Sequence, residues 1–293
     1  MKVLLLGKNG QLGWELHRTL QPLGEVIALD APDIDFTDGK ALREKVTTIR
    51  PQVIINAVAY TDVDRAERES DLVMKVNAEA PGVLASTASD LHALFIHYST
   101  DFVFDGLKKT PYTETDIPNP LNVYAHGKFR GDQLVEEVGG AYLILRCSWI
   151  YSNRRVNFVK KVLEWAHCKT ELRIVDDQVG SPTWARGIAE VTAQLIGQGK
   201  QDPWQWGKQY HGVYHLADAG CASRYEWAQE ILNLDPNRDR QMVQSLLPAL
   251  SSDFLTPAKR PLFTVLDSTL FSETFDLRLP HWLESLRFAM DHG

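Results

Sequence analysis

Tyr124 and Lys128 are the residues whose types and spacing point most directly to chemistry. Residues four apart share one face of a helix, so the phenol and the ammonium can point into the same cleft. A tyrosine with an ordinary pKa of about 10 exchanges protons poorly at neutral pH, but a neighbouring cation stabilises the phenolate and lowers that pKa. The pair therefore predicts a general acid suited to a developing alkoxide, with Tyr124 as the acid.

Two hydroxyl side chains, Ser99 and Thr100, lie about 24 residues before Tyr124. They follow an apolar run that begins at Ala93 and is typical of a buried strand. Side chains at the carboxyl end of a parallel strand face the ligand crevice of an open α/β sheet. The spacing leaves both hydroxyls open as candidates to contact a reacting carbonyl oxygen.

Three glycines, Gly7, Gly10 and Gly13, lie where an apolar run gives way to a helical pattern. Glycines at this spacing permit a tight turn and let the N–H groups of a helix N-terminus approach a pyrophosphate, so they predict a dinucleotide site. Asp30, expected at the end of the second strand, can bind the ribose 2′-hydroxyl of NADH, whereas Lys8 could contact the 2′-phosphate of NADPH. The choice between the two cofactors stays open.

The composition excludes several other functions. Of 293 residues, 44% are hydrophobic and 24% charged, as in ordinary folded proteins. The net charge of −7 creates no general attraction for nucleic acid or an anionic membrane. Apolar runs fall short of the roughly 18 residues of a membrane span, and the N-terminus lacks a secretory signal, so we expect a cytoplasmic protein. The cysteines (147, 168 and 221) are widely spaced and predict neither disulfides nor zinc.

The surrounding segments alternate between strand and helix. Nearly all-apolar runs, typical of parallel strands covered on both faces, are expected at 2–6, 25–29, 53–57, 93–99 and 142–148. A helix from about Tyr124 to Val138 carries the catalytic pair. This alternation predicts an α/β fold, a Rossmann-type doubly wound parallel sheet with a smaller C-terminal substrate lobe. We expect a dinucleotide-binding domain over 1–150, joined by about 171–198, and a substrate lobe from 151–170 and 199–293.

Longer motifs carry a family resemblance. They are NAVAYTDVDRAE at 56–67, STDFVFDG at 99–106, PLNVY at 120–124, RCSWIY at 146–151, DDQVGSPT at 176–183 and TPAKRP at 256–261. Together with the glycine turn, these motifs resemble the dTDP-4-dehydrorhamnose reductase family of the extended short-chain dehydrogenases/reductases. The resemblance runs from residue 1 to about 260, and motifs this long and ordered are far more specific than a glycine turn alone.

The resemblance implies an activity, a cofactor and residue roles. The reaction is reduction of the 4-keto group of dTDP-6-deoxy-L-lyxo-4-hexulose to dTDP-L-rhamnose, which supplies this sugar for cell-surface polysaccharide such as O-antigen. NADPH or NADH would deliver the hydride, Tyr124 would protonate the nascent oxygen, and Lys128 would lower the pKa of Tyr124 and hold the nicotinamide ribose. The family pattern selects Thr100 over Ser99 as the donor to the carbonyl oxygen. The implied cofactor-binding residues are Gly7, Lys8, Gly10, Gln11, Leu12, Gly13, Asp30, Asp35, Phe36, Ala59, Tyr60, Thr61, Tyr124 and Lys128.

The resemblance also implies a substrate pocket for a dTDP-sugar. Its members are Thr100, Asp101, Phe102, Trp149, Lys259 and Arg260. Phe102 stands where relatives often have tyrosine, so the hydrogen bond of that phenol is missing. Arg260 and Lys259 would bind the diphosphate, because the guanidinium fork matches phosphate oxygens.

Some members of the family bind Mg²⁺ through glutamates at a dimer contact. Glu15 matches one of these positions, but Arg186 and Leu283 occupy the others, and a cation disfavours Arg186 as a neighbour. We therefore expect no metal ion, and a monomer or weak homodimer.

Three alternatives remain beside this interpretation. Another sugar-nucleotide reductase would carry the same motifs. A sugar-nucleotide dehydratase shares the fold but needs a second acid next to Asp101, where this chain has Phe102. A non-catalytic regulatory subunit can keep the fold, but would be expected to lose Tyr124 or Lys128, and both are present.

Overall fold

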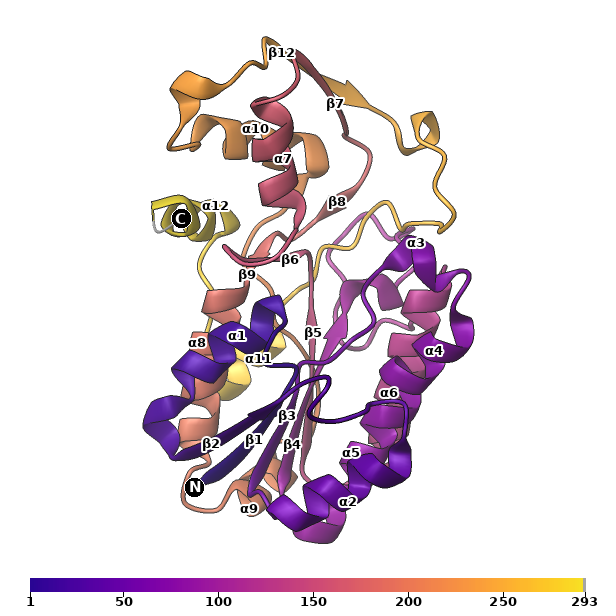
Figure 1. The fold of residues 1–293 in the computed structure, drawn as a ribbon, viewed down its shortest axis with the longest axis vertical. Helices are drawn as coiled ribbons and strands as arrows, with labels where there is room; N and C mark the ends of the chain where they lie inside the picture. Colours follow the sequence, from indigo (N-terminus) through magenta and orange to yellow (C-terminus); the bar gives the residue numbers. More distant parts are fainter. Residues whose placement is uncertain (292–293) are drawn as a thin grey trace.

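The computed structural model describes residues 1–291, and its centre is one parallel sheet (Figure 1). Six strands follow the order β10-β5-β4-β3-β1-β2, and every neighbouring pair is parallel. They are β1 (Lys2–Leu6), β2 (Glu25–Leu29), β3 (Val53–Asn56), β4 (Leu94–Thr100), β5 (Tyr142–Cys147) and β10 (Gly212–His215). The predicted doubly wound α/β fold is confirmed. The strand order reverses between β1 and β3, where sheets of this kind bind ligands at their carboxyl edge.

Helices cover both faces of the sheet (Figure 1). One face is covered by α1 (Gln11–Thr19), α8 (Ala185–Gln198), α9 (Pro203–Gln209) and α11 (Thr269–Phe275). The other is covered by α2 (Gly39–Ile49), α5 (Ala80–Leu91) and α6 (Val123–Val138), with the short α3 (Val63–Ala66) and α4 (Ser70–Met74) beside α6. The chain between α4 and α5 forms one wider helical turn, at Lys75–Glu79. Within residues 1–291, no helix is both long and apolar enough to cross a membrane.

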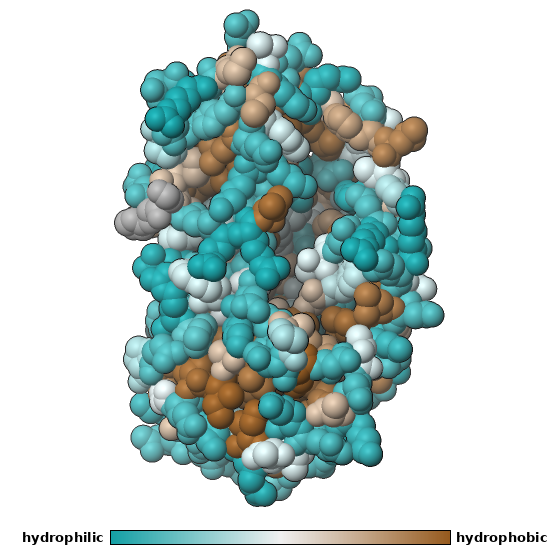
Figure 2. Space-filling view, viewed as in Figure 1, coloured by the Kyte–Doolittle hydropathy of each residue, from teal (hydrophilic) through white to brown (hydrophobic). Residues whose placement is uncertain are grey.

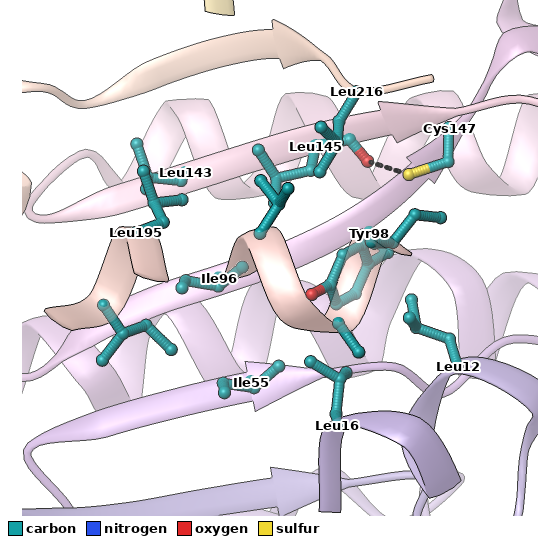
Figure 3. Close-up of a cluster of buried hydrophobic side chains, with 14 of the residues drawn as sticks. Leu12, Leu16, Ile55, Ile96, Tyr98, Leu143, Leu145, Cys147, Leu195 and Leu216 are labelled. Carbon is teal, nitrogen blue, oxygen red and sulfur yellow. Dashed lines mark hydrogen bonds between the residues drawn. The ribbon is translucent and has the colours of Figure 1, made fainter. Parts of the chain in front are cut away.

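The hydrophobic core beneath α1 fixes the position of the glycine turn. Leu12 and Leu16 of α1 pack with Ile55 of β3 and Ile96 of β4 in one buried cluster (Figure 3). Leu16, Ile55 and Ile96 have no exposed surface. Burying a leucine or isoleucine side chain stabilises the folded state by about 1.5–3 kcal/mol. This packing holds the N-terminus of α1 at the carboxyl edge of the sheet.

A second group of elements, which we call the upper lobe, lies beyond that carboxyl edge (Figure 1). It contains α7 (Phe158–Ala166), α10 (Arg224–Asn233), α12 (Trp282–Asp291) and three small sheets. The sheets pair β7 (Glu171–Val175) with β12 (Ser245–Ala249), β6 (Ile150–Tyr151) with β9 (Thr183–Trp184), and β8 (Val179–Gly180) with β11 (Ala222–Ser223). The lobe has its own core around Trp227. Figure 2 shows that the surface is hollowed between the lobe and the sheet.

The expected assignment of residues to the two parts is wrong in two places. The segment 171–175 was expected to join the main sheet, but β7 pairs with β12 and buries Leu172 and Ile174 in the upper lobe. Its burial alternates, so only one face is covered. Conversely, β10 is a strand of the main sheet, and α9 and α11 pack on that sheet. Tyr214 of β10 packs against Phe271 and Phe275 of α11.

Candidate active site

The glycine turn joins β1 to α1 and leaves donors free at the helix N-terminus. Gly7 has a φ of 89°, a conformation that favours glycine, and a Cβ on Gly13 would lie 1.9 Å from the Gly7 carbonyl oxygen. The first N–H groups of a helix have no intrahelical partner, and Gly10 at the N-cap of α1 has no side chain to accept from them. They face a cavity of about 620 Å³ lined by Gly10, Gln11 and Leu12 on one side and by Tyr124 and Lys128 on the other. Turn, donors and cavity fit a dinucleotide.

The charged side chains beside the turn already have partners within the protein. Both Asp30 carboxylate oxygens accept backbone N–H bonds, from Asn9 at 2.9 Å and from Ala31 at 2.8 Å. The Lys8 ammonium lies 2.6 Å from a carboxylate oxygen of Asp33, which was not among the expected cofactor residues. This ion pair lowers the pKa of Asp33. Neither Lys8 nor Asp30 lines the cavity.

The remaining expected cofactor residues divide into two groups. Ala59 and Thr61, after β3, line the cavity. Phe36 is buried in the core under α2 and α5, and both Asp35 contacts go to Thr37. The Tyr60 hydroxyl donates to Glu69 at 2.8 Å. The structure therefore brings Ala59 and Thr61 to the catalytic pair, and turns the Asp35, Phe36 and Tyr60 side chains to other partners.

Thr100 and Tyr124 meet at a second cavity, which adjoins the first. This cavity of about 400 Å³ is lined by Thr100, Phe102, Tyr124 and Trp149. The residues that it shares with the cofactor cavity are Gln11, Thr61, Ser99, Tyr124, Ile150 and Val156. Thr100 ends β4, and Asn122 caps α6 by accepting the Ala125 N–H at 2.9 Å, which places Tyr124 in the first helical turn. Tyr124 is therefore common to the two cavities.

Burial has the largest effect on the pKa of Tyr124. It raises the pKa of Tyr124 to about 12, although the Thr100 hydroxyl acts in the opposite direction. The expectation that this pKa is lowered is wrong in direction, because desolvation of the phenolate outweighs its favourable contacts. The phenol thus stays protonated at neutral pH, as a proton donor must.

Lys128 is 2% exposed and is held by a buried polar network. Its ammonium donates to the Tyr98 carbonyl at 2.6 Å and lies 3.1 Å from Nε2 of His97. Burial lowers the pKa of Lys128 to about 8, while the buried Asp132 carboxylate raises it. Asp132 in turn accepts from Ser99 at 2.8 Å and pairs with Arg146 at 3.3 Å. The Ser99 hydroxyl thus belongs to the Lys128 network, although Ser99 lines both cavities, whereas Thr100 lines the second cavity with Tyr124.

Asp101 and Trp149 line the second cavity, and neighbouring side chains fix their positions. One Asp101 oxygen accepts from Ser148 at 2.8 Å and from Thr264 at 2.6 Å, and burial raises the pKa of Asp101. Trp149 has a φ of 42°, and its ring stacks against Trp227 with centroids 5.7 Å apart. A Cβ on Gly180 would lie 2.5 Å from this ring, which explains the glycine in the motif at 176–183.

The residues expected to bind the diphosphate lie outside both cavities that Tyr124 lines. Lys259 and Arg260 line a third hollow, of about 750 Å³, under the upper lobe. Arg260 makes a two-pronged ion pair with Asp64, at 3.0 Å and 2.6 Å, so its fork is occupied. Neither residue reaches the cavity of Thr100 and Tyr124.

Arg224 is a cavity residue that was not among the expected site residues. It begins α10, and its guanidinium carbon lies 3.5 Å from the centre of the Trp149 ring. It lines both the second cavity and the third hollow. One signal was available: a capping box at Ser223 and Glu226 marks the helix start, and a cation in the first turn opposes the helix dipole.

Glu15, which matches one of the Mg²⁺-binding glutamates of some family members, lies beside an arginine in the structure. Among residues 1–291, no group of three or more His, Cys, Asp or Glu side chains is arranged to hold a metal ion. Glu15 is 5% exposed and lies 3.8 Å from Arg18.

A dinucleotide turn at the switch point, with a tyrosine–lysine pair on the helix after β4, defines an oxidoreductase of the short-chain dehydrogenase/reductase class. The family model described as "RmlD substrate binding domain" matches residues 1–293. A dTDP-4-dehydrorhamnose reductase of Burkholderia thailandensis is 40% identical over 285 residues, covering 96% of this chain and 95% of the relative. The chain belongs to the dTDP-4-dehydrorhamnose reductase family, which confirms the resemblance seen in its motifs.

Solved structures agree with this assignment. A dTDP-4-dehydrorhamnose reductase of Clostridium acetobutylicum has a TM-score of 0.90 and 35% identity, covering 100% of this chain and 99% of that one. The enzyme of Bacillus anthracis, solved in complex with NADP, has a TM-score of 0.88 and 30% identity, with 100% and 99% coverage.

Proposed function

We propose that this protein reduces the 4-keto group of dTDP-6-deoxy-L-lyxo-4-hexulose to give dTDP-L-rhamnose, with NADPH or NADH as the reductant. The observation that carries the proposal is the position of Tyr124, which lines both the cavity at the glycine turn and the cavity at Thr100. A hydride donor in the first and a ketone in the second would meet beside one phenol. Membership of the reductase family supports the same reaction.

The residues divide the chemistry between them. The bound nicotinamide supplies the hydride that reduces C4 of the sugar. Thr100 donates a hydrogen bond to the carbonyl oxygen, where negative charge develops. Tyr124 gives its proton to that oxygen as the C–H bond forms, so the ketone becomes an alcohol and the phenolate is reprotonated afterwards. Lys128 contacts the nicotinamide ribose and, as an ammonium, stabilises the transient phenolate.

The cofactor and substrate divide between the two parts of the chain. The sheet edge, with Gly7, Gly10, Gly13, Ala59 and Thr61, binds the dinucleotide. The sugar lies against Thr100, Phe102 and Trp149, and the nucleoside extends into the hollow under the upper lobe. Asp101 supports the sugar pocket through Ser148 and Thr264. A net charge of −7 gives nucleic acid and anionic membranes no general attraction, and we propose a cytoplasmic monomer or weak homodimer.

The test is an NADPH-oxidation assay with enzymatically prepared dTDP-4-keto-6-deoxy sugars. Substrate passed through the 3,5-epimerase should be consumed with one equivalent of NADPH, and dTDP-L-rhamnose should be identified by mass and NMR. Substrate without epimerisation should react much more slowly. Incubation with dTDP-glucose separates the dehydratase alternative, since a dehydratase would produce the 4-keto sugar. No NADPH oxidation with the epimerised sugar would refute the proposal.

A further inference from the structure

Arg224 is a partly buried cation without an anionic partner among the described residues. Within residues 1–291, its guanidinium makes no ion pair within 4.0 Å and donates no hydrogen bond; only the more distant charges of Asp101 and Arg260 act on it. It lies instead against aromatic rings, 3.5 Å from the Trp149 centroid and 5.0 Å from the Phe158 centroid. The flat faces of these rings stabilise the cation, but they leave its five N–H donors unused.

The position of Arg224 makes this arrangement costly. Burial lowers the pKa of Arg224 to about 9, which still leaves the side chain charged at neutral pH. As the first residue of α10, it also lies at the positive end of a helix dipole. The Asp101 carboxylate attracts it weakly, but both Asp101 oxygens already accept hydroxyl donors. An anionic ligand would satisfy the guanidinium and offset the cost of its desolvation.

Arg224 and Phe158 line both the cavity of Thr100 and Tyr124 and the hollow under the upper lobe. A nucleotide sugar whose C4 lies beside Tyr124 extends its diphosphate away from the reacting carbon and its nucleoside beyond that. The diphosphate of such a ligand must cross the boundary between the two cavities, where Arg224 lies.

We propose that Arg224 is the residue that binds the diphosphate of the nucleotide sugar, in place of Arg260. This inference rests on the proposed function for the identity of the substrate. The fork of Arg224 is free for two phosphate oxygens, whereas Arg260 is already committed to Asp64 at 3.0 Å and 2.6 Å. Arg260 holds the 256–261 loop against α3, and Lys259 contributes only as an exposed charge at the rim.

The experiment compares Arg224→Met with Arg260→Met in the full chain, saturated with NADPH, by titration calorimetry with dTDP and with thymidine. Methionine keeps apolar bulk against Trp149 but removes the charge. Arg224→Met should bind dTDP about 10- to 100-fold more weakly, the loss expected for a charged hydrogen-bonded contact, with thymidine affinity unchanged. Arg260→Met should change dTDP affinity less than about 3-fold. Arg238→Met, an exposed position on the same lobe, is the matched control.

Two further measurements keep the result decisive. NADPH affinity and thermal unfolding of each variant report whether the fold survives, and Arg224→Lys, which retains charge without the fork, should recover part of the dTDP affinity. Unchanged dTDP affinity in a folded Arg224→Met, or a larger loss in Arg260→Met, would overturn the proposal. If the wild type fails to reduce the dTDP-sugar, titration with UDP still tests Arg224 as a diphosphate residue, so the two failures are distinguishable.

Discussion

The cofactor edge of the sheet and the boundary with the upper lobe differ in whether their charged side chains have polar partners. At the cofactor edge, Lys8 is paired with Asp33, and Asp30 accepts two backbone N–H groups. At the lobe boundary, Arg224 has aromatic neighbours and no acceptor among the described residues. An anion at the first region would meet mainly the backbone N–H donors at the N-terminus of α1, which require no buried charged side chain. The second depends on one desolvated side chain, so single substitutions should affect it more.

Tyr124 lies between these regions and lines both cavities, so cofactor and substrate should both contact it. Its substitution should therefore reduce activity more than any other single change. Tyr124→Phe removes the proton donor but keeps the ring, so kcat should fall about 10²- to 10⁴-fold, the usual contribution of a general acid. NADPH and dTDP affinities should change little, as measured by calorimetry. Tyr142→Phe, at the first position of β5 and in the hydrophobic core, is the control and should keep normal turnover. Turnover within 5-fold of wild type in Tyr124→Phe would remove Tyr124 from the mechanism.

A substitution in the glycine turn tests whether the cofactor edge acts through its backbone. A Cβ on Gly13 would lie 1.9 Å from the Gly7 carbonyl oxygen, so Gly13→Ala must displace the turn and the N–H groups of α1. NADPH binding should weaken roughly 10- to 100-fold, or about 1.4 kcal/mol per factor of ten, while dTDP affinity is retained. The matched control is Gly197→Ala, because a Cβ there meets nothing within 4 Å. Equal NADPH affinity in the two variants would contradict this account of the turn.

The network behind Lys128 should set the pH dependence of the reaction. Burial lowers the pKa of Lys128 to about 8, so its charge is lost as pH rises through that value, and kcat/KM should fall on the alkaline side. Asp132 raises this pKa, and Asp132→Asn should therefore begin the fall roughly one pH unit lower. The exposed Glu137→Gln on the same helix is the control. Coincident pH profiles for wild type and Asp132→Asn would show that Asp132 has only a structural role.

The two regions also differ in how much the sequence could predict. The glycine turn, β1 to β5 and the Tyr124–Lys128 helix follow from local apolar runs, caps and spacing, and the structure has them within a few residues. Lys128, Arg224 and Arg260 meet partners that lie 30 to 196 positions away along the chain and become neighbours only through packing. Arg260 meets Asp64 across 196 positions. Arg224 lies over Trp149 because Trp227 of α10 packs against the rings of Trp149 and Tyr151, which no spacing rule encodes. For the same reason the burial that raises the pKa of Tyr124 could not be anticipated.

The smallest expected effect concerns cofactor choice, where the paired charges of the cofactor edge can be uncoupled. Asp33 holds the Lys8 ammonium at 2.6 Å and neutralises it. Asp33→Asn should free Lys8 for the 2′-phosphate and raise the ratio of kcat/KM for NADPH over NADH about 3- to 5-fold, as expected for an exposed ion pair.

A double-variant cycle separates this effect from a general change in charge. Lys8→Ala alone should alter the ratio by less than 2-fold, because Asp33 already cancels the Lys8 charge, and Lys8→Ala combined with Asp33→Asn should abolish the gain. Asp90→Asn, an exposed carboxylate paired with Arg43, supplies the control. The gain should also shrink at high salt, because ions screen the attraction between exposed charges. The screening length is about 10 Å at 0.1 M ionic strength and becomes shorter as the salt concentration rises. A gain that persists in the double variant would mean that loss of a negative charge, and not release of Lys8, changes the preference.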